Sequence, residues 1–113
     1  MFLNNYAKNM DTKEYKIIIT PTAQREMIKI YEYIMDELYN IKASYNLMNL
    51  VEDAILELKF QPYVYAKIEK IDELDREYRR ITIKNYVILY TIDETENVVY
   101  IAHMYYIRKN YLD

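Results

Sequence analysis

The pattern of hydrophobic and polar positions predicts three strands in the last third of the chain. Tyr78–Ile83 and Tyr86–Ile92 are rich in β-branched and aromatic residues, and only two residues separate them. That spacing is typical of a tight β-hairpin. A polar run, Asp93–Asn97, then leads into a third run of the same kind, Val98–Tyr106. We therefore expect a three-stranded antiparallel meander.

A short strand and a long helix are predicted before this meander. Glu14–Thr20 holds a short apolar run that suits a buried strand, and Thr20 and Pro21 are typical of a helix cap and of the first helical position. From there apolar residues recur at spacings of three or four, which defines one face of a helix. The pattern predicts a helix from Pro21 to about Asn40, with its apolar face formed by Ala23, Met27, Ile30, Ile34 and Leu38.

A second helix is predicted from about Lys42 to Phe60, where Pro62 stops it. Because the connection is short, the two helices should be antiparallel neighbours. Residues 63–76 are mixed and charged, and we interpret them as a loop with one helical turn. The order strand, helix, helix, strand, strand, strand predicts an α+β fold in which a two-helix hairpin packs on one face of a small sheet.

The two-residue hairpin loop also predicts which side chains face the helices. It places Ile83 opposite Tyr86 and Ile81 opposite Ile88, and we expect this face, continued by Tyr90 and Ile92, to be buried. In the last strand we expect one alternate set to be buried and the other to be open. The buried set is Tyr100, Ala102 and Met104, and the open set is Ile101, His103 and Tyr105. Arg80, His103 and Tyr105 would then share one exposed surface.

Composition narrows the classes of function. The 113 residues fit one domain, which we place at residues 14–113 after a flexible extension at residues 1–13. Cysteine and glycine are both absent, which excludes disulfides, thiolate metal sites and glycine-rich phosphate loops. Without glycine, Asn85 and Asn97 are the expected left-handed turn residues. We expect neither a metal nor a cofactor.

Charge and hydropathy limit the partners. The formal net charge of −3 is unlike the basic excess of most nucleic-acid binders, so any polyanion contact would need a local cluster. The chain shows no secretion signal and no apolar run of membrane-spanning length. We therefore expect a cytoplasmic protein with no membrane contact.

Several segments resemble the RelE/ParE family of type II toxin–antitoxin toxins, over about Tyr15 to Leu112. The matching features are TPTAQREMIKIYEYI after the first strand, LKFQP at the end of the second helix, and the strand segments RRITIKNYVILYTIDE and VVYIAHMYYIRKNY. The third strand with its spaced tyrosines, and the last strand running into Arg and Lys, are the most specific parts. The resemblance implies a RelE/ParE-like fold.

The resemblance also implies a toxin that arrests growth until a cognate antitoxin encoded beside it neutralises it. RelE-like and YoeB-like members cleave mRNA in the ribosome, whereas ParE-like members poison DNA gyrase and cut nothing. Both mechanisms stay open, as does a third interpretation, a divergent or inactive toxin fold that acts only as an antitoxin-binding module. The resemblance leaves the oligomeric state open as well, a homodimer included.

Candidate site residues follow from the same resemblance. Arg79 and Arg80 match basic residues of the family's second strand, and Tyr106 stands where YoeB-like toxins have a catalytic histidine. Val87 replaces the strand arginine of many ribonuclease members, which weakens the ribonuclease interpretation because that arginine stabilises the phosphate. A general base would be Glu69 or Glu73. The catalytic candidates are thus Arg80, His103 and Tyr106, and the candidates for nucleic-acid or target binding are Arg79, Tyr105, Arg108 and Lys109.

Each candidate also has a structural explanation. The two arginines could pair with nearby carboxylates such as Asp75 and Glu77. His103 is the only histidine, and a histidine on a strand often has a structural role, although an unperturbed imidazole is the side chain that changes charge near neutral pH. The tyrosines at the end of the last strand could stack on a base or cover the edge of the sheet.

Overall fold

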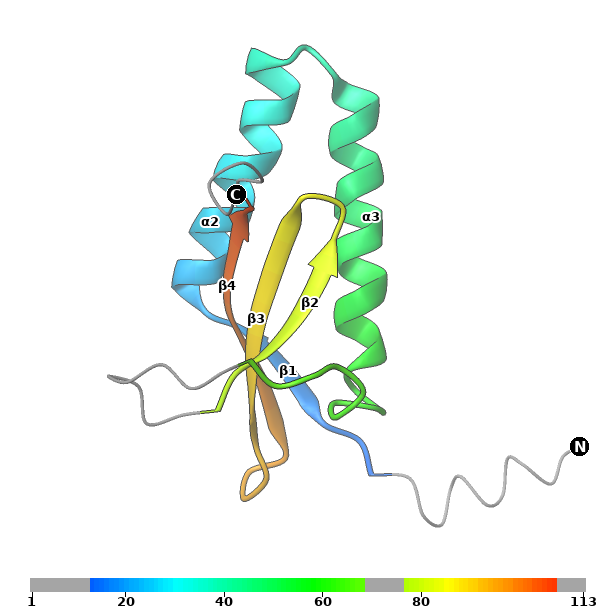
Figure 1. Ribbon diagram of the computed structural model, residues 1–113, viewed down its shortest axis with the longest axis vertical. Coiled ribbons are helices and arrows are strands. Elements are labelled where there is room, and N and C mark those ends of the chain that lie inside the picture. The colour runs from blue at the N-terminus through cyan, green and yellow to red at the C-terminus, as the bar shows by residue number, and fades with distance from the viewer. Residues whose placement is uncertain (1–12, 69–76, 108–113) are drawn as a thin grey trace, which may run out of the picture.

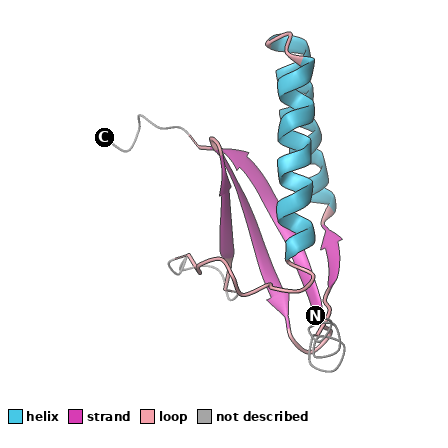
Figure 2. Ribbon diagram, turned by 90° about the vertical axis from the view of Figure 1, so that its right-hand side faces the viewer, coloured by secondary structure: helices cyan, strands magenta, loops and turns pink. Residues whose placement is uncertain are grey.

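The computed structural model describes residues 13–68 and 77–107, and it has the predicted α+β architecture (Figure 1). Two helical segments form an antiparallel hairpin, and four strands form one sheet. Figure 2 shows that the helices cover one face of the sheet and leave the other face open. The elements are β1 (Lys16–Ile19), α2 (Pro21–Glu32), η1 (Tyr33–Glu37), α3 (Ile41–Glu57), β2 (Arg79–Ile83), β3 (Tyr86–Asp93) and β4 (Val98–Tyr106).

The strands lie in the order β1-β4-β3-β2. β2, β3 and β4 form the predicted antiparallel meander. β1 pairs with β4 in parallel, a position that the sequence pattern did not specify. β4 is therefore an interior strand, and the outer edges of the sheet belong to β1 and β2.

The helix boundaries follow from local capping. The Thr20 side chain accepts a hydrogen bond from the Ala23 N–H and Pro21 takes the first helical position, both as predicted. The first helix does not continue regularly to Asn40, because its hydrogen bonding changes at Tyr33 into the π-helix η1. Asn40 instead caps α3, where its side chain accepts from the Ala43 N–H. α3 thus starts and ends slightly earlier than predicted.

The hairpin register is confirmed. Ile83 pairs with Tyr86 and Ile81 pairs with Ile88, and this face forms the core with the helices. The turn residues are only partly as predicted. Asn97 is left-handed with φ 59°, but at the hairpin Lys84 rather than Asn85 takes that conformation, with φ 54°.

The predicted orientation of β4 is wrong in its first half. Ile101, expected on the open face, is fully buried, whereas Tyr100 and Ala102 are partly exposed. The cause is an irregularity in the ladder: Leu89 pairs with His103 and Tyr90 with Ile101, so Ala102 has no register partner on β3. Such a bulge shifts the side-chain alternation by one residue. Val99, Ile101 and Met104 therefore all face the core, while His103 and Tyr105 stay on the open face.

Some predictions concern residues outside the described ranges. The flexible extension predicted at residues 1–13 lies there except for Lys13, as do Glu69, Glu73, Arg108 and Lys109. Among the helices that the structure describes, none is long and apolar enough to cross a membrane.

Candidate functional site

The open face of the sheet brings three of the predicted site residues together. Arg80 pairs with Leu89, and Leu89 pairs with His103, so these side chains form one row across β2, β3 and β4. Adjacent strands lie about 4.8 Å apart, which puts the Cα atoms of Arg80 and His103 about 10 Å apart. Tyr105 lies on the same face, with its ring centroid 6.1 Å from that of His103. The expected shared surface of Arg80, His103 and Tyr105 is therefore present.

A carboxylate from α2 completes this row at its β4 end. The Nδ1 atom of His103 lies 3.2 Å from Oε1 of Glu26, and the same oxygen accepts the backbone N–H of Met104 at 3.0 Å. β1 ends at Ile19, opposite Ile101, so the edge of β4 beyond that point is open to α2. Glu26 thus binds both a backbone N–H at this edge and the histidine ring.

Glu26 was not among the residues predicted from the sequence. It lies 77 positions before His103, and its side chain is one of several charged ones on α2. No local motif marks it, because the contact depends on where β1 ends and how α2 crosses the edge of β4.

Tyr106 lies on the other face of the sheet. It pairs with Tyr86, and the two rings are 5.5 Å apart in an edge-on arrangement. Tyr86 belongs to the face that packs toward the helices. The structure therefore brings Arg80 and His103 together but separates Tyr106 from both.

Arg79 is bound within the protein. Its Nη1 donates to the backbone oxygen of Tyr65 at 2.6 Å and more weakly to that of Tyr63 at 3.4 Å. Its guanidinium also lies 4.9 Å from the centre of the Tyr63 ring. These contacts hold the segment after α3 against the start of β2 and give Arg79 a structural role, while its predicted target contact stays a prediction.

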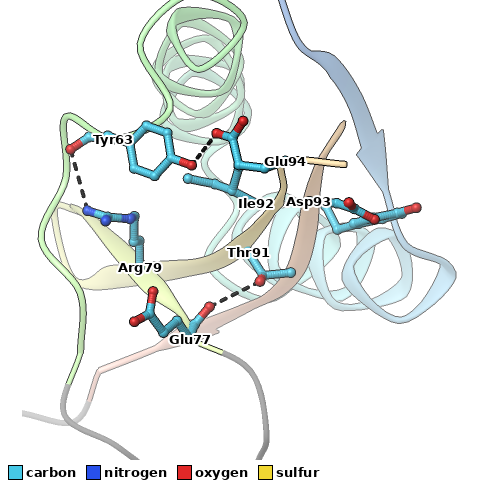
Figure 3. Close-up of a pocket in the computed structure, with 8 residues that line it drawn as sticks. Tyr63, Glu77, Arg79, Thr91, Ile92, Asp93 and Glu94 are labelled. Atoms are coloured by element: carbon cyan, nitrogen blue, oxygen red, sulfur yellow. Dashed lines mark hydrogen bonds between the residues drawn. The ribbon is translucent and has the colours of Figure 1, made fainter. Parts of the chain in front are cut away.

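A polar cleft of about 420 Å³ lies beside Arg79, at the end of β3. Figure 3 shows Tyr63 and Arg79 on one wall, with the Tyr63 hydroxyl directed at Glu94. The cleft is lined by Tyr63, Glu77, Arg79, Thr91, Ile92, Asp93, Glu94 and Tyr100. Several of its polar groups bind one another, as when the Thr91 hydroxyl donates to the Glu77 backbone oxygen.

Glu94 is the centre of this polar network. Its carboxylate accepts hydrogen bonds from Lys13 Nζ at 2.8 Å, from the Tyr15 hydroxyl at 2.7 Å, and from the Tyr63 hydroxyl. The hydrogen bonds from Lys13, Tyr63 and Tyr15 lower the pKa of Glu94 to about 2. The bond to Glu94 in turn raises the pKa of Tyr63 to about 12. At neutral pH Glu94 is thus ionised and accepts the three hydrogen bonds of this network.

This network predicts a specific loss of stability in acid. An ordinary Glu has a pKa of about 4.3, so the lowered value means that Glu94 stabilises the fold above that range. The contribution should disappear as the pH falls from about 4.5 to about 2. We expect the urea midpoint of the wild-type protein to fall more steeply over this window than that of Glu94→Gln. Glu96→Gln, a neighbouring exposed position, is the control and should follow the wild type. An equally steep fall of the urea midpoint with pH in the wild type and Glu94→Gln would contradict a stabilising role of this network.

The described residues offer no obvious metal site. Among them, no group of three or more His, Asp and Glu side chains is arranged to hold a metal ion. The open face carries the guanidinium of Arg80, the imidazole of His103 held by a carboxylate, and the phenol of Tyr105.

The fold is one that solved toxin–antitoxin structures share. A chain of the chromosomal ParDE system from P. aeruginosa matches with a TM-score of 0.67 at 11% identity, over 84% of this chain and 98% of that one. A chain of the Mycobacterium tuberculosis RelBE2 complex matches with a TM-score of 0.57 at 22% identity, over 83% of this chain and 92% of that one. A chain of the archaeal RelE–RelB complex from Pyrococcus horikoshii matches with a TM-score of 0.54 at 16% identity, over 85% of this chain and 98% of that one. These identities establish the fold alone.

The class of fold is thus a small α+β domain like those found in the RelBE2 and ParDE structures. A family model described as the ParE toxin of the type II toxin–antitoxin system parDE matches residues 17–108. The chain therefore belongs to the ParE toxin family of type II toxin–antitoxin systems. No curated protein matches the sequence.

Proposed function

We propose that this toxin arrests growth by a ParE-like mechanism, in which it binds and inhibits DNA gyrase without cutting nucleic acid. The observation that supports this choice is the position of Tyr106, which packs on Tyr86 on the face opposite Arg80 and His103. The three catalytic candidates therefore do not converge on one substrate. Val87, at the place of the strand arginine of many ribonuclease members, is buried and apolar.

A cognate antitoxin is the second part of the proposal. The tip of the helical hairpin exposes a group of large apolar side chains, of which Tyr39 is the most exposed at 88%. Exposed apolar patches of this kind mark protein interaction sites. The group consists of Tyr33, Leu38, Tyr39, Ile41 and Tyr45. An antitoxin segment with apolar anchors would cover it and keep the toxin inactive, and this protein should act in the cytoplasm, where its targets are.

The experiment that tests this function is a gyrase assay with the purified full-length chain. Supercoiling by gyrase should be inhibited, and growth arrest in cells should be accompanied by DNA breaks while mRNA stays intact. Addition of the antitoxin should restore supercoiling. Growth arrest with full gyrase activity would contradict the proposal.

RNA cleavage at the ribosome is a second candidate, and one observation favours it. His103 lies in the same row as Arg80 and is held by Glu26, which is an arrangement suited to proton transfer beside a phosphate. Primer extension on cellular mRNA after induction separates the two candidates, since only a ribonuclease produces new, codon-phased ends.

A further inference from the structure

We propose that the tip of the helical hairpin, residues 32–45, is the surface by which the toxin docks on DNA gyrase. Tyr39 is the anchor of this contact and enters an apolar pocket with a basic rim. The inference rests on the proposed function, gyrase inhibition without cleavage, and adds the surface and the residue that make the contact. An antitoxin bound over the same tip would then block the docking directly.

Tyr39 has a backbone conformation that is unusual for its side chain. Its φ is 50°, in the left-handed region, where a β-carbon crowds the backbone and glycine is preferred. On one side, the Leu38 N–H donates to the backbone oxygen of Tyr33 at 3.2 Å. On the other side, the Asn40 N–H donates to that of Ile34 at 3.1 Å. The backbone of Tyr39 is therefore held from both sides, so docking through it costs little conformational entropy.

The fold gains little from the Tyr39 side chain, which is 88% exposed. Lys84 has a similar φ of 54°, but it is a charged residue in the turn between β2 and β3, where exposure is ordinary. A large aromatic side chain that is both strained and exposed indicates a functional residue instead. Leu38 and Ile41, its neighbours in the chain, are 54% and 60% exposed, so Tyr39 belongs to an apolar patch.

The shape of the tip indicates the kind of partner. Figure 1 shows that the hairpin continues past the ends of the strands, so its tip projects from the molecule. A projecting aromatic side chain fits a pocket on a folded protein, and such anchors provide most of the binding energy of an interface. A large folded enzyme such as gyrase can offer that pocket, whereas an antitoxin segment would lie over the tip.

The charge of the tip favours a basic surface around the pocket. The tip holds three carboxylates and one ammonium, which gives it a net charge of −2: Glu32, Asp36, Glu37 and Lys42. All four side chains are exposed, and none takes part in an ion pair between described residues. An enzyme that binds DNA has basic surfaces, and an acidic tip is complementary to them. The same charge disfavours a direct contact between the tip and DNA.

The test compares the inhibition of gyrase supercoiling by the full-length wild type, Tyr39→Ala and Tyr39→Gly. We expect the toxin concentration that halves supercoiling to rise about 30-fold or more in both variants, the loss typical of an interface hot spot. Tyr39→Gly removes the β-carbon at a positive φ, so its urea midpoint should equal or exceed that of the wild type. A weaker inhibitor that is no less stable cannot owe its loss to unfolding.

Lys84→Gly is the matched control for the backbone. It makes the same kind of change at an exposed left-handed residue outside the tip, so it should inhibit gyrase like the wild type.

A second experiment tests the charge of the tip. The double variant Asp36→Asn, Glu37→Gln should bind immobilised gyrase more slowly than the wild type, with a weaker dependence on salt, because charges at a rim steer association. The double variant Glu52→Gln, Asp53→Asn changes the net charge equally on an exposed part of α3 outside the tip, and it should associate like the wild type. Equal association rates of the two double variants would contradict the charge complementarity.

The possible results separate the inference from the function on which it rests. Full inhibition by Tyr39→Ala and Tyr39→Gly would overturn the inference and leave gyrase inhibition standing. If these variants lost only antitoxin binding, the tip would belong to the antitoxin alone. An equal loss in Lys84→Gly would overturn the inference as well, because the loss would not be specific to Tyr39. A wild type without effect on gyrase would remove the proposed function and the inference together.

Discussion

Replacing Ile101 with alanine is expected to lower the free energy of unfolding by about 2–5 kcal/mol, the usual cost of deleting a large buried aliphatic side chain. Ile101 is fully buried in the core between the sheet and the helices. Its burial depends on the bulge at Ala102, which turns this side chain inward. Urea denaturation followed by circular dichroism measures the change.

Tyr100→Ala is the matched control that tests the register of β4. Tyr100 precedes Ile101 in the same strand and lines the polar cleft instead of the core, so its removal should cost clearly less. A regular alternation without the bulge would bury Tyr100 and expose Ile101. A larger loss of stability in Tyr100→Ala than in Ile101→Ala would therefore contradict the bulge.

Replacing Arg79 with alanine is expected to destabilise the protein by about 1.5–3 kcal/mol, the range for hydrogen bonds that involve a charged group. The substitution removes the donor to the backbone oxygens of Tyr65 and Tyr63 and the guanidinium above the Tyr63 ring. Arg79→Lys should recover little of the loss, because an ammonium lacks the planar fork of the guanidinium. Chemical denaturation of both variants measures the difference.

Arg80→Ala is the control for Arg79. Arg80 is the next residue, but its side chain lies exposed on the open face, so its removal should change the stability by less than about 0.5 kcal/mol. Arg80, predicted from the sequence as a catalytic candidate, and Arg79, predicted as a target-binding one, would then separate into a candidate functional residue and a structural one. Similar losses of stability in Arg79→Ala and Arg80→Ala would refute this division of roles.

The features that the sequence predicted correctly depend on local signals. The cap at Thr20, the end of the second helix before Pro62 and the pairing of Ile81 with Ile88 all follow from residues close in sequence. The features that it missed depend on contacts between distant segments. The bulge at Ala102 changes the alternation of β4 without any Gly or Pro to mark it, and the parallel pairing of β1 with β4 joins strands about 80 residues apart.

The candidate site, like the fold, was predictable where it depends on local signals and not where it depends on contacts between distant segments. The row of Arg80, His103 and Tyr105 follows from strand alternation, and the bulge leaves it intact because it lies on the other side of His103 along β4. The separation of Tyr106 from this row follows from the same alternation, but matching the sequence to a family motif concealed it. Glu26 could not be predicted, since nothing in α2 indicates which of its carboxylates meets the edge of β4.

The position of β4 has a consequence for when the toxin can become active. β4 is the last of the four described strands to be synthesised, yet it lies between β1 and β3, and neither of these strands pairs with the other. A nascent chain that lacks β4 has β1 without its strand partner, and its core lacks Val99, Ile101 and Met104. Pairing over such a distance in sequence is slow and comes late in folding. The sheet, and with it the open face, is thus completed only after translation of β4.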